Sequence, residues 1–124
     1  MSFRLPEVVY AAFHNQKYRG LPEAPTHVAK VGSLSQGRVV ELGIVIENEI
    51  ISAAGFKAYG DTYCIATFSW LCENIIGRKI DFLATLTISH IAKELELPQH
   101  KASCALLAED GLTQLMELHN VSRK

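Results

Sequence analysis

Three runs rich in Val and Ile lie within residues 27–59, and the chain beyond them has the spacing of helices. The runs are HVAKVGSL, GRVVELGIVI and EIISAAGFKAY. The link ENE between the second and third runs is short enough for a hairpin. Side chains alternate along an extended strand, so the second run has one apolar face, formed by Val40, Leu42, Ile44 and Ile46. We therefore expect an antiparallel sheet of three strands with one buried face.

The predicted helices follow the strands, apart from one short helix at residues 5–14. Apolar residues at helical spacing predict helices over residues 62–76 and 84–96. A third helix is expected to begin near Ser103, since serine is a good N-cap residue. Strands followed by helices indicate an α+β fold, in which a three-stranded antiparallel sheet carries helices on one face. The architecture is an N-terminal helix, the sheet and a C-terminal helical half.

Composition and charge indicate the class of protein and exclude some partners. A chain of 124 residues with 48% hydrophobic and 20% charged residues is typical of a single globular domain, here residues 1–124. The net charge of -1 and the lack of a basic cluster argue against a nucleic-acid partner. The N-terminal sequence has no long apolar run, which argues against a membrane span or signal peptide. Three cysteines cannot all pair, so we expect reduced thiols and a cytoplasmic location.

Several local strings, in this order along the chain, resemble one known family. They are VGSLSQG, FKAYGDTYCIA and KELELPQHKASCALLAEDGL. These strings and the lengths between them resemble the iron-sulfur cluster scaffold family, the IscU type that is also found as the N-terminal domain of NifU proteins. The resemblance implies the α+β fold and a binding protein, not an enzyme. It also implies three cysteines around a shared pocket in which a [2Fe-2S] cluster is assembled, with a cysteine desulfurase or other cluster-assembly proteins as partners.

The chain departs from the family at most of the ligand positions that the resemblance implies. The family's first ligand cysteine falls on Gln36, and its aspartate two residues later falls on Arg38. The second ligand cysteine falls on Asp61 and the auxiliary histidine on Ser103. The third cysteine alone is kept, as Cys104. Iron-sulfur clusters are held chiefly by thiolates, so this is a degenerate ligand set.

Three residues are the candidate cluster or metal ligands: Cys104, Asp61 and Cys64. Cys104 lies at the expected start of a helix and close to Lys101, two features that favour a thiolate able to accept sulfur. The alternative is an ordinary buried cysteine. Cys64 follows Asp61 by one helical turn, so both could face the pocket, although a core cysteine is the simpler interpretation. An iron-sulfur cluster or a single iron or zinc ion is the cofactor that these donors could bind.

Two other residues bear on metal binding. Cys72 lies within an apolar helical stripe and is expected to serve packing. His100 is either a shifted metal ligand or a solvated loop residue. His14, His27, His90 and His119 show no ligand spacing with one another.

Arg38 and Asp61 reverse the residue types of the family, with a base replacing an acid and an acid replacing a cysteine. We hypothesise that they form an ion pair across the former pocket, filling the space of a metal with protein charge. The alternative is that both are solvated loop charges, whose pairing would contribute about 0 to 1 kcal/mol.

The partner surface is altered as well. In the family, a loop reading Leu-Pro-Pro-Val-Lys is bound by an Hsp70-type chaperone, and here it reads LPQHK. Gln99 and His100 remove polyproline stiffness and an apolar anchor, so we expect weakened chaperone docking. Two functions stay open: a divergent cluster-assembly protein with weak metal or sulfur binding at Cys104, or a non-catalytic paralogue that docks assembly partners without holding a cluster.

Overall fold

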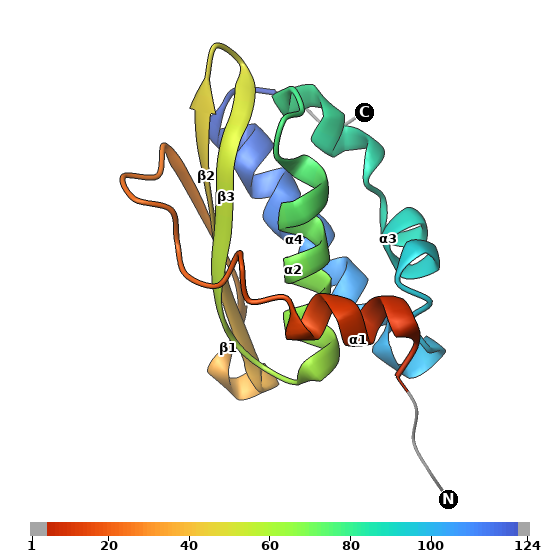
Figure 1. Cartoon of the computed structure of the whole chain (residues 1–124). Helices are drawn as coiled ribbons and strands as arrows, with labels where there is room; N and C mark the ends of the chain where they lie inside the picture. Colours follow the sequence, from red (N-terminus) through yellow and green to blue (C-terminus); the bar gives the residue numbers. More distant parts are fainter. Residues whose placement is uncertain (1–4, 122–124) are drawn as a thin grey trace, which may run out of the picture.

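The computed structural model describes residues 5–121, and the elements follow one another as shown in Figure 1. The first half of the chain contains one α-helix, three strands and a short 3₁₀ turn, η1. The second half is helical. In chain order the elements are α1 (Glu7–His14), β1 (His27–Ser33), η1 (Leu34–Gln36), β2 (Arg38–Glu47), β3 (Ile50–Tyr59), α2 (Thr62–Ile75), η2 (Ile80–Thr85), α3 (Ile88–Glu94), η3 (Gln99–Lys101) and α4 (Ala102–Leu118).

The sheet has the strand order β1-β2-β3 with both pairs antiparallel, as the sequence predicted. A tight turn at Asn48 and Glu49 joins β2 to β3, and both residues have positive φ, 54° and 66°. Two residues in the left-handed region match the right-handed twist of the flanking strands. The ENE link is therefore a two-residue hairpin that pairs Glu47 with Ile50, and an irregularity between Val45 and Ile46 then shifts the register by one residue, so that Leu42 pairs with Phe56.

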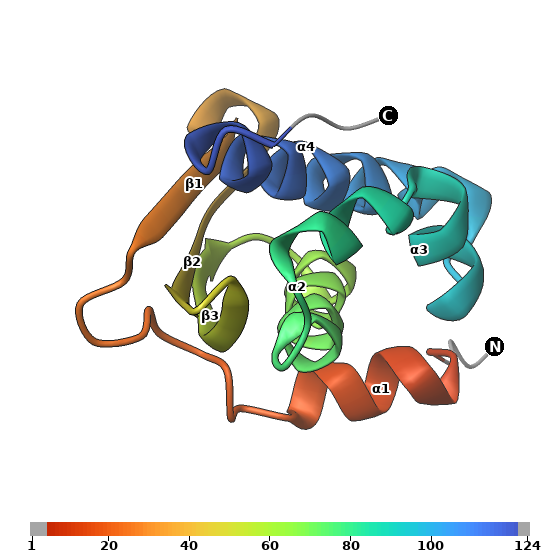
Figure 2. The ribbon, with the colours of Figure 1, turned by 90° about the horizontal axis from the view of Figure 1, so that it is seen from above.

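The helices cover one face of the sheet, which confirms the α+β prediction (Figure 2). α2 packs against β3, and α4 packs against β1. Val40, Leu42 and Ile44 of β2 are fully buried beneath them. Further out, α1 packs on α2 and α3 packs on α4. Cys72 is fully buried in this core, as expected.

One predicted helix and one predicted helix cap were wrong. Residues 84–96 are not one helix, because the chain forms the 3₁₀ turn η2 and then begins α3 at Ile88. The hydroxyl of Thr87 accepts the backbone N–H of His90 at 3.2 Å and so caps α3. The last helix begins at Ala102, near Ser103 as expected, but Ser103 is not its N-cap, since η3 leads directly into α4 and Lys101 occupies the cap position without a side-chain cap bond.

The segment between α1 and β1 runs along β3. Phe56 donates its backbone N–H to the carbonyl of Tyr18 at 2.9 Å, and its own carbonyl accepts from Gly20 at 2.7 Å. A Cβ at Gly55 would lie 2.1 Å from the carbonyl oxygen of Gly20. Glycine is therefore required at residue 55 by the close approach of this segment. Within residues 5–121, no helix is long and apolar enough to cross a membrane.

Candidate functional site

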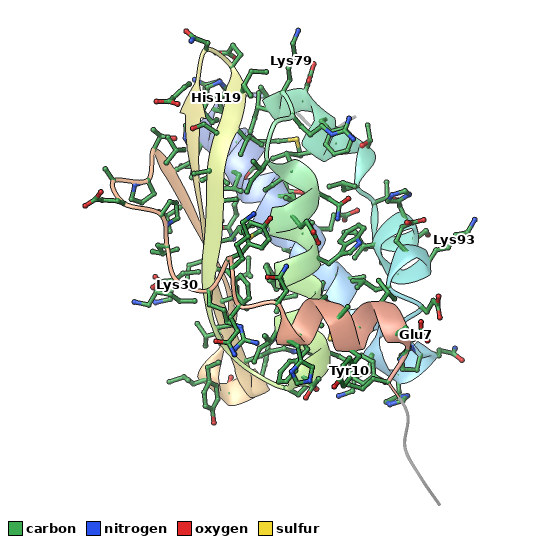
Figure 3. The ribbon with its side chains drawn as sticks, in the orientation of Figure 1. Glu7, Tyr10, Lys30, Lys79, Lys93 and His119 are labelled. Atoms are coloured by element: carbon green, nitrogen blue, oxygen red, sulfur yellow. The ribbon has the colours of Figure 1, made fainter. Side chains whose placement is uncertain are left out.

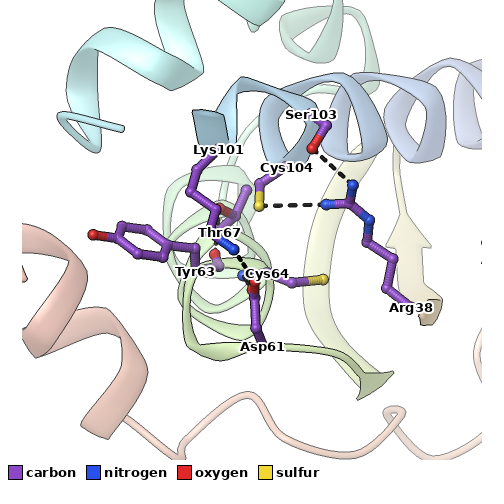
Figure 4. A network of polar contacts seen from close by, with 8 residues as sticks. All are labelled: Arg38, Asp61, Tyr63, Cys64, Thr67, Lys101, Ser103 and Cys104. Carbon is purple, nitrogen blue, oxygen red and sulfur yellow. Dashed lines mark hydrogen bonds and ion pairs between the residues drawn. The ribbon is translucent and has the colours of Figure 1, made fainter. Parts of the chain in front are cut away.

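Three segments meet at the end of the fold where α2 and α4 begin (Figure 4). Arg38 opens β2, Asp61 occupies the junction between β3 and α2, and Lys101, Ser103 and Cys104 lie at the start of α4. The sequence therefore brings together the positions that the resemblance assigns to cluster chemistry, although its residue types differ.

Asp61 joins two helices. One carboxylate oxygen accepts the backbone N–H of Cys64 at 2.9 Å and so caps α2, and the other is paired with the ammonium group of Lys101. Burial on its own raises the pKa of Asp61, but the bonds from Lys101 and Cys64 and the charges of Lys101 and Arg38 outweigh it. The pKa is therefore lowered, and Asp61 is a firmly ionised carboxylate with both oxygens engaged.

Arg38 reaches across to α4. Its Nη2 donates to the hydroxyl of Ser103 at 2.7 Å, and its Nη1 lies 3.6 Å from the sulfur of Cys104 as a donor. The hypothesised ion pair with Asp61 was wrong, since the ion pairs among residues 5–121 join Asp61 to Lys101 and His119 to Glu49. The physical reason is that Lys101 already neutralises Asp61, which leaves the guanidinium of Arg38 for Ser103 and Cys104.

Cys104 has none of the exposure expected of a reactive thiol. Its side chain is fully buried, and burial, followed by the charge of Asp61, raises its pKa. Arg38 and Lys101 act in the opposite direction without reversing the shift. Lys101 thus acts in the expected direction, but burial outweighs it and the pKa of Cys104 is raised.

Cys64 is also buried, and burial raises its pKa to about 12. It does lie one turn after Asp61, as predicted, and the contact between them runs through the Cys64 backbone. A Cβ at Gly60 would lie 3.1 Å from the Cys64 sulfur, which shows how closely the β3–α2 junction encloses that thiol. All three cysteines are free thiols.

A cavity of about 250 Å³ borders this cluster and is lined by Gln36, Gly37, Arg38, Asp61, His100, Lys101 and Ser103. A second, of about 410 Å³, shares Gln36, Arg38 and Ser103 with the first and continues along α4 to Asp110. Gln36, Asp61 and Ser103, the positions at which the resemblance places family ligands, thus line one space. The space is cationic, since it holds Arg38 and Lys101 against the single carboxylate Asp61.

The packed donors do not fit a [2Fe-2S] cluster. Such a cluster takes four ligands, normally thiolates. Within the part of the chain that the structure describes, no three His, Cys, Asp or Glu side chains are gathered to hold a metal ion. Cys104 and Asp61 are instead held by Arg38 and Lys101. Metal ligation by Cys104, Asp61, Cys64 or His100 stays a prediction, and it requires those cations to move.

A polar cluster that the sequence did not indicate lies at the other end of the molecule, near His119 (Figure 3). His119 Nδ1 is 3.1 Å from His27 Nε2, and its Nε2 is 3.1 Å from a carboxylate oxygen of Glu49. The far side of the His27 ring contacts the hydroxyl of Thr26 at 2.7 Å. Because 92 residues separate the two histidines, no local spacing could have revealed the cluster.

The fold is α+β, with helices on one face of a three-stranded antiparallel sheet. Comparison with known sequences identifies the family to which the chain belongs. The family model described as NifU-like N terminal domain matches residues 5–121. The chain belongs to that family, which confirms the resemblance to the IscU and NifU type.

Relatives of known name agree with this assignment. The iron-sulfur cluster assembly protein IscU of Plasmodium falciparum is 42% identical over 82 residues, which cover 66% of this chain and 51% of that protein. The scaffold protein IscU of Haemophilus influenzae is 40% identical over 83 residues, covering 66% of each chain. The match therefore spans between half and two thirds of the length of these relatives.

Solved structures show the same fold. The N-terminal part of a nitrogen-fixing NifU-like protein from Brucella abortus superposes with a TM-score of 0.74 at 14% identity, covering 93% of both chains. A chain from Fervidobacterium islandicum, assigned to the cluster assembly scaffolds of the SUF system, gives 0.70 at 19% identity, covering 86% of this chain and 92% of that one. At these identities, the similarity concerns the fold alone.

Proposed function

We propose that this protein takes part in iron-sulfur cluster assembly as a divergent scaffold-type protein, with Cys104 as its sulfur acceptor. It is a binding protein and not an enzyme. Membership of the NifU-like family supports this role. The observation that carries it is the position of Cys104, the family cysteine kept in this chain, against Arg38, which lines the cavity formed by the family's other ligand positions.

The chemistry that Cys104 can perform is transfer of a sulfur atom from a persulfide. Its sulfur attacks the outer sulfur of a persulfide on a cysteine desulfurase, which is the partner that we propose. A new S–S bond forms on Cys104, the bond to the partner's cysteine breaks, and the proton lost by Cys104 ends on the departing thiol. Atoms and electrons balance without an external oxidant.

A second candidate function is docking without a bound cluster. It is favoured by the pairing of Asp61 with Lys101 and of Cys104 with Arg38, because both donors are held by cations. A single iron or zinc ion binding through Cys104 and Asp61 would have to displace those cations. Docking of an Hsp70-type chaperone is not part of this proposal, since residues 99–101 form a 3₁₀ turn in place of the extended segment that such a chaperone grips.

Persulfide loading tests the proposed function. The purified chain is incubated with a cysteine desulfurase and cysteine, and persulfide is mapped by mass spectrometry. We expect loading on Cys104 that is lost in Cys104→Ser and kept in the matched control Cys72→Ser, whose thiol lies in the core. Loading confined to Cys64, or absent altogether, would contradict the proposal and leave the docking function.

A further inference from the structure

Arg38 contacts the buried thiol of Cys104. Its sulfur is fully buried, and neither of the two neighbouring cavities is lined by Cys104 itself. Both cavities are lined by Arg38, whose Nη1 lies 3.6 Å from the sulfur. Arg38 is therefore a side chain that contacts both the cavities and the thiol.

The two cations of the site differ in how they are neutralised. Lys101 is paired with Asp61, whereas Arg38 has no carboxylate within ion-pair distance among the described residues. Ser103 is a neutral partner, and its hydroxyl fixes Nη2 at 2.7 Å. That bond leaves Nη1 directed at the sulfur of Cys104 (Figure 4). Arg38 is thus held in place without a directly paired carboxylate among the described residues, although the charge of Asp61 acts on it from further away.

The missing partner has a defined chemistry. A guanidinium N–H bonds a neutral thiol weakly, but it forms a charge-assisted bond to an anionic sulfur. A persulfide on Cys104 would extend the side chain by one S–S bond of about 2 Å. The guanidinium of Arg38, 3.6 Å from the present sulfur, is within reach of the added one. A divalent metal ion, in contrast to an anionic sulfur, is repelled by the positive charge of Arg38.

From these contacts we infer that Arg38 is a positioning residue that binds the sulfur carried on Cys104 and excludes divalent metal ions from it. The inference rests on the proposed function, because it assumes that Cys104 receives sulfur. The resemblance implies an aspartate at the position that Arg38 occupies in this chain. On this inference, the pocket with Arg38 holds a sulfur anion and its counter-ion in place of a metal and its thiolates. Ser103 serves the same end by orienting the guanidinium.

Three variants at one position separate this role from a merely structural one. Arg38→Gln removes the charge, Arg38→Lys restores it, and Arg38→Asp reverses it. Lys79→Gln is the matched control, since it removes one positive charge from an exposed residue at the opposite end of the molecule (Figure 3). Urea unfolding of each variant establishes that it is folded before it is tested.

Two probes act on each folded variant without a partner protein. Inorganic polysulfide donates a sulfur atom to Cys104 and is left one sulfur shorter, and zinc ion reports metal access to the thiol. We expect Arg38→Gln to load persulfide about tenfold more slowly, as the loss of one charge-assisted bond implies, with Arg38→Lys restoring most of the rate. Zinc affinity should change in the opposite direction and be highest for Arg38→Asp. A general loosening of the site would raise or lower access for both probes together.

The outcomes distinguish this inference from the proposed function. The role of Arg38 is overturned if polysulfide loads wild type and Arg38→Gln at equal rates, or if zinc affinity is the same for every residue placed at position 38. Either result overturns it even when desulfurase loads Cys104. Loading that depends on Arg38 with polysulfide, but no loading from desulfurase, upholds the role of Arg38 and contradicts the proposed sulfur donor.

Discussion

Asp61 at the start of α2 is paired with Lys101 at the start of α4, so a carboxylate at a family cysteine position ties two helices together. The same carboxylate caps α2 through the backbone N–H of Cys64. Whatever sulfur chemistry the site performs, this residue contributes to the stability of the fold. A cysteine at the same position would supply neither the charge for Lys101 nor a comparable cap.

The two contributions of Asp61 can be separated by substitution. Asp61→Ala removes the cap and the ion pair, and we expect it to lower the free energy of unfolding by about 1–2 kcal/mol. Asp61→Asn keeps a good capping side chain and loses the charge, so it should cost about 0–1 kcal/mol. Urea unfolding at neutral pH measures both. Equal losses for the two variants would show that the cap contributes little.

Substitution of two glycines by alanine should change the free energy of unfolding in opposite directions. Gly111 lies in α4, and a Cβ there would lie 3.5 Å from the side chain of Leu42, an ordinary contact. Gly111→Ala should therefore raise the free energy of unfolding by about 0.5–1 kcal/mol, because alanine is the better helix former. Gly55→Ala places its Cβ against the Gly20 carbonyl and should cost about 1–3 kcal/mol. Thermal unfolding measures both, and a stabilising Gly55→Ala would contradict the packing described.

Acidification should weaken the fold through His27. Burial, and then the positive charge of His119, lowers the pKa of His27 below its usual 6.5. The folded chain thus binds this proton more weakly than the unfolded chain does, so the stability conferred by neutral His27 is complete above pH 6.5 and is lost as the pH falls through the lowered pKa. His119 and Thr26 contact this ring, and Glu49 contacts the far nitrogen of His119, so protonation of His27 also disturbs these contacts.

The measurement is urea unfolding from pH 7.5 down to pH 5. His27→Gln should flatten the dependence on pH, whereas His90→Gln, at an exposed residue of α3, should keep it. The range lies above the lowered pKa of Asp61, so that carboxylate stays ionised throughout. A pH dependence that His27→Gln leaves unchanged would assign the effect to another group.

The sequence predicts the sheet well because alternation of Val40, Leu42 and Ile44 is a local pattern that one buried face requires. It predicts the partners within the site poorly. We expected Arg38 as the partner of Asp61, whereas the structure pairs Asp61 with Lys101, because the tertiary fold determines where η3 places Lys101. The contact between His27 and His119 likewise needs β1 and the end of α4 to lie together. The sequence likewise left open whether Cys104 is buried, because local sequence does not show how deeply a side chain lies.

Reconstitution with iron and sulfide provides the last prediction. Stable [2Fe-2S] binding by the unmodified chain is not expected, because Cys104 is the only thiol at a family ligand position and Arg38 and Lys101 occupy the pocket. Anaerobic reconstitution should therefore leave no visible absorption. The triple variant Gln36→Cys, Arg38→Asp and Asp61→Cys restores the thiols and removes the cation, so absorption should appear, and adding Cys104→Ser should abolish it. Because Asp61→Cys also removes the α2 cap, the variant is first checked for cooperative unfolding. Strong absorption from the unmodified chain would show that Arg38 and Lys101 yield readily to the cluster, and the protein would then be a working scaffold.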